Sequence, residues 1–84
     1  IELGKGVCGS AWATATTLLV PNVELFPGHI ACSAESKSEI VVPIHTKSGE
    51  IWGVLDVDSE HLNHFDGLDQ RELEKFCLSL ETIL

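Results

Sequence analysis

The stretch from Glu39 to Asp58 constrains the fold more than any other part of the chain, because it predicts a β-hairpin. EIVVPIHT (39–46) is rich in β-branched residues, which favour strands. KSGE (47–50) is typical of a hairpin turn, with Gly49 placed for a positive φ, and IWGVLDVD (51–58) predicts the returning strand. Pro43 has no N–H for the sheet, so it predicts a bulge or an unpaired position there.

The second strand of this hairpin carries two acidic residues on one face. From Gly53 onward, Val54, Asp56 and Asp58 point one way and alternate residues point the other. Two acidic residues on one face, with Cα atoms about 7 Å apart, indicate a chemical role for that face.

Helices and a short strand are expected around the hairpin. Residues 1–9 predict a glycine-rich loop that enters a helix, and Leu18-Leu19-Val20 predicts a short strand. Asp66 is a good N-cap for a C-terminal helix. Its apolar residues form one stripe at helical spacing: Leu73, Phe76, Cys77, Leu80, Ile83 and Leu84.

These elements do not close a sheet. Three strands leave exposed edges, so we expect further strands from an N-terminal part or from a partner chain. Ile1 in place of methionine also indicates a portion of a longer protein.

Charge and length exclude some classes of function. The 84 residues carry 13 acidic and 5 basic side chains, a net charge of −8, which disfavours nucleic acid as a partner. No apolar run approaches the roughly 18 residues of a membrane span, and no signal peptide is visible. The expected location is therefore cytoplasmic, without membrane contact.

A cysteine among small and polar residues is the first candidate for chemistry. Cys32 lies in PGHIACSAESKSEI (27–40), and a loop thiol can act as a nucleophile. Cys8 is a second thiol, of the kind that converts a sulfenic acid into a disulfide. Glu39, Asp56 and Asp58 can hold an ammonium group or keep a proton for donation. These residues together predict a redox site.

Metal sites are the competing interpretation. Cys8, His29, Cys32 and one acid could supply four zinc ligands, but no second close pair of ligands accompanies His29 and Cys32. The segment DVDSEHLNHFDG begins like a calcium-binding loop, yet His61 stands where such a loop requires glycine. We therefore expect no metal and no other cofactor. Cys77, within the apolar stripe, is expected to be a core or interface residue.

Several motifs resemble those of one enzyme family, over essentially the whole chain. GKGVCGSAWAT, VPNVELFPGHIACSAESKSEIVVPI and GVLDVDSEHLNHFDGLDQ resemble the free methionine-(R)-sulfoxide reductases, which are GAF-domain proteins. The resemblance implies an α+β fold with a GAF-like antiparallel sheet and flanking helices. Residues 1–84 would form the C-terminal part of a single GAF domain whose N-terminal strands, and a third family cysteine, lie outside this chain.

The resemblance also implies roles for individual residues. Cys32 matches the catalytic cysteine, and Cys8 matches the cysteine that forms a disulfide with it. Glu39, Asp56 and Asp58 match acids that line the substrate pocket, and His29 is expected to help shape it. The implied substrate is free methionine-(R)-sulfoxide and the implied reductant is thioredoxin.

A homodimer is expected, since the apolar stripe of the last helix needs a covering surface. The alternative is a GAF module that binds a small molecule or senses oxidation without turnover.

Overall fold

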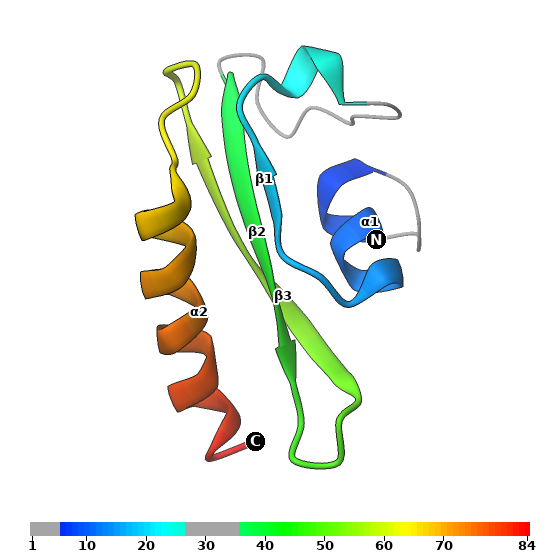
Figure 1. Cartoon of the computed structure of the whole chain (residues 1–84). Helices are drawn as coiled ribbons and strands as arrows, with labels where there is room; N and C mark the ends of the chain where they lie inside the picture. The colour runs from blue at the N-terminus through cyan, green and yellow to red at the C-terminus, as the bar shows by residue number, and fades with distance from the viewer. Residues whose placement is uncertain (1–5, 27–35) are drawn as a thin grey trace.

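The predicted hairpin forms the centre of the structure, a computed structural model that describes residues 6–26 and 36–84. Its elements, in chain order, are α1 (Gly6–Thr14), β1 (Leu18–Val20), the 3₁₀ turn η1 (Val23–Leu25), β2 (Ser38–His45), β3 (Ile51–Ser59) and α2 (Gly67–Glu81). The strands form one antiparallel sheet in the order β1-β2-β3, with α1 and α2 on opposite faces (Figure 1). The expected α+β class, an antiparallel sheet flanked by helices, is confirmed.

The register of the hairpin decides which side chains meet across it. Glu39 pairs with Asp58 and Val41 pairs with Asp56, along a ladder that runs from Ser38 to His45. Pro43 is paired with Val54, and the irregularity lies between Ile44 and His45 instead. The strand therefore has the expected irregularity in its pairing, but this irregularity follows Ile44 and does not fall at Pro43. The N–H of His45, next to this irregularity, donates a hydrogen bond to the Glu81 side chain of α2.

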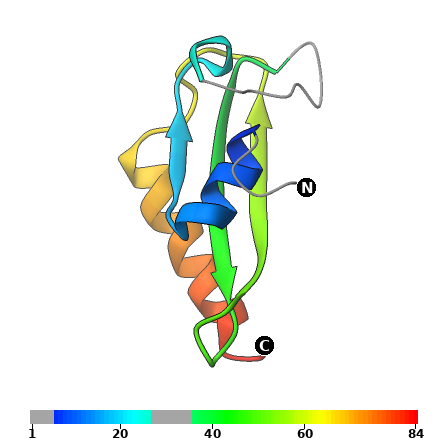
Figure 2. The same cartoon turned by 90° about the vertical axis from the view of Figure 1, so that its right-hand side faces the viewer.

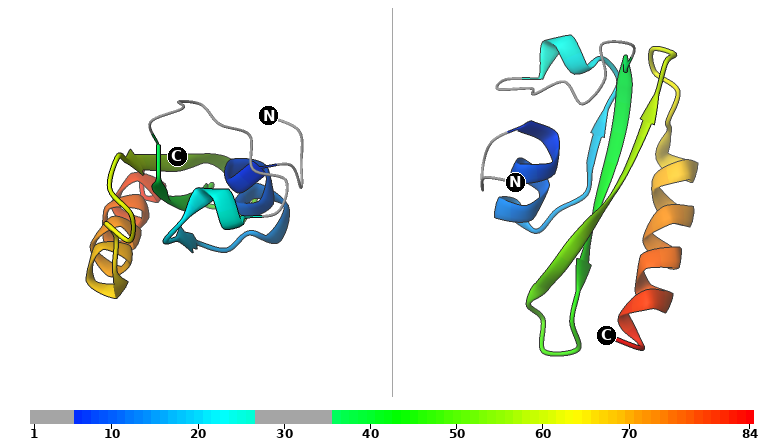
Figure 3. Two further views of the ribbon diagram at one scale, coloured as in Figure 1. Left: turned by 90° about the horizontal axis from the view of Figure 1, so that it is seen from above. Right: turned by 180° about the vertical axis from the view of Figure 1, so that it is seen from behind.

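Strand β2 is buried on both faces, because each face is covered by a helix. Ile40, Val42 and Ile44 pack in a cluster with Phe65 and Cys77 on the α2 side. Val41 packs on the other side, in a cluster with Val7, Ala11, Val20 and Val23. The period-two alternation of a strand thereby splits the core into two layers. Figure 2 shows the sheet from the α1 side, and Figure 3 shows the two helices on its opposite faces from above and from behind.

Helix α1 begins at Gly6, within the segment that the sequence predicts to be a loop. Gly6 has φ +67°, a conformation that glycine adopts at little cost. Gly9 and Ala11 are buried, so the helix lies close to the sheet through residues with almost no side chain. The glycines that favour a loop in isolation therefore serve close packing here.

Helix α2 is capped and anchored by its own polar residues. The Asp66 side chain accepts hydrogen bonds from the N–H groups of Leu68 and Asp69, and the Asp69 side chain accepts one from the Asp66 N–H, which is a capping box. Leu73, Cys77, Leu80 and Leu84 pack against the sheet. Two members of the predicted stripe do not, since Phe76 and Ile83 are 54% and 78% exposed.

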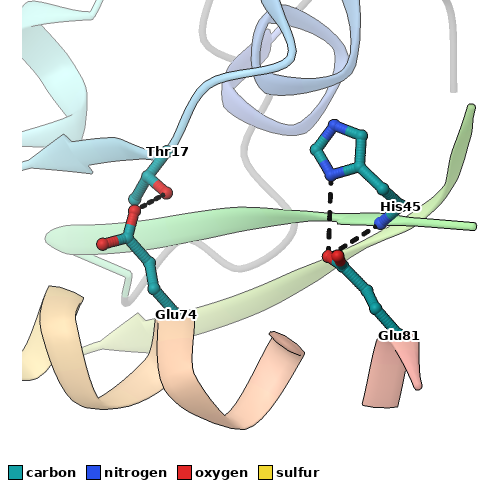
Figure 4. Close-up of polar contacts among 4 residues, drawn as sticks. All are labelled: Thr17, His45, Glu74 and Glu81. Atoms are coloured by element: carbon teal, nitrogen blue, oxygen red, sulfur yellow. Dashed lines mark hydrogen bonds and ion pairs between the residues drawn. The ribbon is translucent and has the colours of Figure 1, made fainter. Parts of the chain in front are cut away.

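Two further hydrogen bonds join α2 to the edge of the sheet (Figure 4). The Thr17 hydroxyl donates to Glu74 at 2.6 Å, and the His45 N–H donates to Glu81 at 3.0 Å. They fix α2 on one face and leave the opposite face to α1. No helix in the described part of the chain is long and apolar enough to span a membrane.

Candidate functional site

Three reactive side chains meet on the face of the sheet that α1 covers. Cys8 comes from α1, Glu39 from the start of β2 and Asp56 from the middle of β3. Their Sγ and carboxylate oxygen atoms all lie within 4.8 Å of one another. Strand alternation places Glu39, Asp56 and Asp58 on this face, and the hairpin register sets the two aspartates beside the glutamate.

Glu39 is the most perturbed acid of this group. Its side chain is buried, with only 4% of the residue exposed. Its pKa is raised from 4.5 to about 9, first because burial disfavours the charged form, and then because of the hydrogen bond and negative charge of Asp56, followed by those of Asp58. Glu39 therefore holds a proton at neutral pH and can give it up to a substrate atom.

This proton makes the stability of the protein depend on pH. Between about pH 4.5 and 9 the folded state binds a proton at Glu39 that the unfolded state has released, so the free energy of unfolding falls as the pH rises through this window. Chemical denaturation at a series of pH values will measure this slope. We expect Glu39→Gln to flatten it, and equal slopes for the two proteins would contradict the buried proton.

The two aspartates of β3 differ in their surroundings. Asp56 Oδ1 is fully buried and has no hydrogen-bond partner among the described residues. Asp58 is exposed and accepts a hydrogen bond of 3.2 Å from the Ser36 hydroxyl. A buried oxygen without a donor is uncommon in folded proteins, so Asp56 presents an acceptor that is ready for a cationic ligand.

Cys32 and His29 lie outside the described residues, so their places relative to the cluster stay predictions. Contacts are described for the residues that flank this segment, Phe26 and Ser36. Phe26 packs against the same apolar cluster as Cys8, and Ser36 is bonded to Asp58.

Two serines contribute to the site that sequence reasoning did not single out. Ser36 holds Asp58, as described above. Ser38 is fully buried, and its hydroxyl donates to the His61 carbonyl at 2.5 Å and accepts from the His64 N–H at 3.3 Å. This pair of bonds fixes the loop after β3 beside Glu39. The only signal in the sequence is the position of these serines at or just before the start of the strand.

Cys77 has no part in this site. It is 2% exposed in the apolar cluster between β2 and α2, on the other face of the sheet, and burial raises the pKa of its thiol. A groove of about 540 Å³ between α2 and the edge of β2 also lies away from the site, since Cys8, Glu39, Asp56 and Asp58 are absent from its lining.

The arrangement combines a thiol, a protonated carboxyl group and further carboxyl oxygens in one partly enclosed place. The thiol can attack or form a disulfide, the protonated acid can donate to a leaving oxygen, and the remaining oxygens can accept from an ammonium group.

Comparisons with known proteins agree on the fold. The family model described as "GAF domain" matches residues 1–84. "GAF domain-containing protein A" of Dictyostelium discoideum is 57% identical over 81 residues, which are 96% of this chain and 51% of that protein. "Free methionine-R-sulfoxide reductase" of Saccharomyces cerevisiae is 52% identical over 77 residues, 92% of this chain and 43% of that protein.

A solved structure extends this similarity. The X-ray structure of free methionine-R-sulfoxide reductase from Neisseria meningitidis in complex with its substrate matches with a TM-score of 0.94 and 50% identity, over 98% of this chain and 48% of that one. The chain thus spans about half the length of the curated relatives it matches.

Proposed function

This chain belongs to the GAF domain family, and we propose that it is the catalytic portion of a reductase of free methionine-(R)-sulfoxide. The observation that carries the proposal is the meeting of Cys8, protonated Glu39 and Asp56 on one face of the sheet. Support comes from relatives of about 50% identity that are named for this reaction, one of them solved with its substrate.

The first chemical step reduces the sulfoxide and oxidises Cys32. The Cys32 sulfur attacks the sulfoxide sulfur while Glu39 gives its proton to the departing oxygen. The attack forms a transient S–S bond, which breaks together with the S–O bond of the substrate as the hydroxyl group passes to the Cys32 sulfur. Methionine leaves, Cys32 is left as a sulfenic acid, and the proton that the Cys32 thiol gives up replaces the one that Glu39 donated. The electron pair that methionine gains is the one that Cys32 loses.

The second step restores the thiols. The Cys8 sulfur attacks the sulfenic acid, so a Cys8–Cys32 disulfide forms and water leaves. Thioredoxin then reduces this disulfide by exchange. Meanwhile Asp56 and Asp58 hold the ammonium group of the substrate, and His29 shapes the pocket. A free amino acid has such an ammonium group, whereas methionine within a protein does not, so two acids near the sulfur favour the free substrate.

The remaining architecture follows from the same assignment. Residues 1–84 are the C-terminal part of a single GAF domain, and the strands that complete the sheet come from a preceding part of the protein. Exposed apolar side chains on α2 and just after it, among them Phe76 and Ile83, suit contacts with such a part or with a second copy in a homodimer.

The alternative function is a GAF module that binds a small molecule or senses oxidation without turnover. It would use the same thiols, but it would consume at most one sulfoxide per chain, even with reductant in excess. A buried carboxyl group that keeps its proton at neutral pH favours the enzyme, since simple ligand binding does not require a proton donor.

The role of Cys8 gives a direct test. We expect Cys8→Ser to release one methionine per chain in the absence of reductant and then to turn over slowly with thioredoxin, because no second thiol resolves the sulfenic acid. Burst and steady-state methionine release measure the two phases.

Cys77→Ser is the matched control, because it removes a buried thiol from the other face of the sheet. It should keep both the burst and the steady-state rate. Full thioredoxin-dependent turnover by Cys8→Ser would exclude the proposed disulfide step.

A further inference from the structure

The cluster at the site has the composition of a metal-binding site as well as that of a reductase. We propose that Cys8, Glu39 and Asp56 bind a Zn²⁺ ion in the thiol-reduced protein, and that this ion inhibits the enzyme reversibly. The inhibition rests on the proposed function, whereas the binding does not.

The donor atoms suit zinc better than the abundant hard cations. A cysteine sulfur with two carboxylate oxygens provides three protein ligands, and a water molecule can take the fourth position of a tetrahedral zinc. Mg²⁺ and Ca²⁺ prefer sites made of oxygen alone, and the thiolate moves the preference toward zinc. The ligands come from α1, β2 and β3, so the fold holds all three in place before the ion arrives.

The spacing of the ligand atoms is close to what the ion needs. The three atoms lie within 4.8 Å of one another. Usual Zn–S and Zn–O lengths place two ligands of a tetrahedral zinc about 3.3–3.6 Å apart. The side chains must therefore close by about 1.5 Å at most, which small rotations about their own bonds provide.

Burial supplies an independent indication of a cationic ligand. Asp56 Oδ1 has no accessible surface and no hydrogen-bond partner among the described residues. Glu39, its neighbour, is 4% exposed. A buried carboxylate oxygen without a donor is costly to a folded protein, and a cation bound to Asp56 Oδ1 supplies the missing interaction. Asp58 is exposed and is left outside the proposed ligand set.

Inhibition follows from what the ion occupies. Zinc binding replaces the protons of the Cys8 thiol and of the Glu39 carboxyl group by bonds to the metal, releases both protons to the solvent, and changes no oxidation state. The Cys8 sulfur is then withheld from the sulfenic acid, and Glu39 and Asp56 are withheld from the substrate. Turnover should stop, and a chelator that removes the ion should restore it.

Binding can be measured with Cd²⁺ and Zn²⁺ alone, on the full-length protein in its thiol-reduced form. This protein carries Cys32→Ser, which removes the other thiol of the proposed catalytic pair. We expect one Cd²⁺ per chain, seen as cadmium–thiolate absorption in the ultraviolet, and Zn²⁺ should displace it. Adding Cys8→Ser should abolish this absorption. Glu39→Gln and Asp56→Asn should each weaken binding by more than about tenfold, since even residues that only hydrogen-bond to a metal ligand contribute that much to affinity.

The controls separate this proposal from the proposed function. Cys77→Ser should leave Cd²⁺ binding unchanged, because that thiol lies on the other face of the sheet. Thiolate absorption that survives Cys8→Ser, or binding that is indifferent to both carboxyl variants, would overturn the zinc site whether or not the protein reduces sulfoxides. Sulfoxide turnover that saturating Zn²⁺ leaves unchanged would overturn the inhibition.

Discussion

Cys32→Ser is expected to abolish the release of methionine from free methionine-(R)-sulfoxide, in both the first turnover and the steady state. A serine hydroxyl is a far weaker nucleophile than a thiol, and oxygen cannot replace sulfur as the atom that accepts the sulfoxide oxygen. Loss of a catalytic nucleophile costs several orders of magnitude in kcat, so we expect a decrease of more than about 10³-fold. Methionine release with thioredoxin and its reductase in excess is the measurement.

This variant also distinguishes the two thiols of the site. Cys8→Ser keeps the first turnover, whereas Cys32→Ser loses it. Cys77→Ser should behave as the wild type. If Cys32→Ser and the wild type turned over at equal rates, Cys32 would not be the nucleophile, and the roles assigned to both Cys32 and Cys8 would fail.

Glu39→Gln is the second large effect, with an expected decrease in kcat of about 10²–10⁴-fold, the usual contribution of general acid catalysis. Glutamine has the same size and can keep a hydrogen bond to Asp56, but it has no acidic proton for the departing oxygen. Because the pKa of Glu39 is raised to about 9, wild-type activity should also fall above about that pH, as Glu39 loses its proton.

Asp58→Asn is the matched comparison, since Asp58 lies opposite Glu39 in the sheet but is exposed. Its expected effect is a higher KM with a smaller change in kcat, as for a group that holds the ammonium in ground state and transition state alike. If Glu39→Gln instead raised KM and preserved kcat, Glu39 would be a binding residue and the proton would have another source.

Local sequence patterns predicted the hairpin and the shared face of its acids. The alternation of IWGVLDVD places Asp56 and Asp58 together, and the turn at KSGE fixes an antiparallel pair. The capping residues of α2 were equally visible, because a cap depends on neighbours within one turn. Each of these features is decided within a few residues.

Features that depend on distant contacts were not predictable in this way. The sequence GKGVCG predicts a loop by its glycines, yet Val7, Gly9 and Ala11 are buried against the sheet and the helix begins at Gly6. The irregularity in β2 lies between Ile44 and His45 rather than at Pro43. The N–H of His45 donates its hydrogen bond to Glu81, which is 36 positions away in the sequence. The raised pKa of Glu39 needs both burial and the exact partners across the sheet.

The sequence predicts which residues belong to the site, but it does not predict how those residues are arranged in space. That Cys8 and Asp56 lie beside Glu39 depends on how α1 packs on the sheet, which spacing along the chain does not reveal. The roles of Cys32 and His29 stay predictions from the sequence. The hydroxyl groups of Ser36 and Ser38 were missed, because a serine before a strand is common and carries no distinct signal.

The central claim is that this protein reduces free methionine-(R)-sulfoxide catalytically. The most direct test is the amount of methionine released per chain by the full-length protein, with excess substrate, thioredoxin and thioredoxin reductase. We predict many equivalents of methionine per chain, and none from Cys32→Ser. Release that stops at one equivalent or fewer per chain would contradict the reductase and identify a sensor instead.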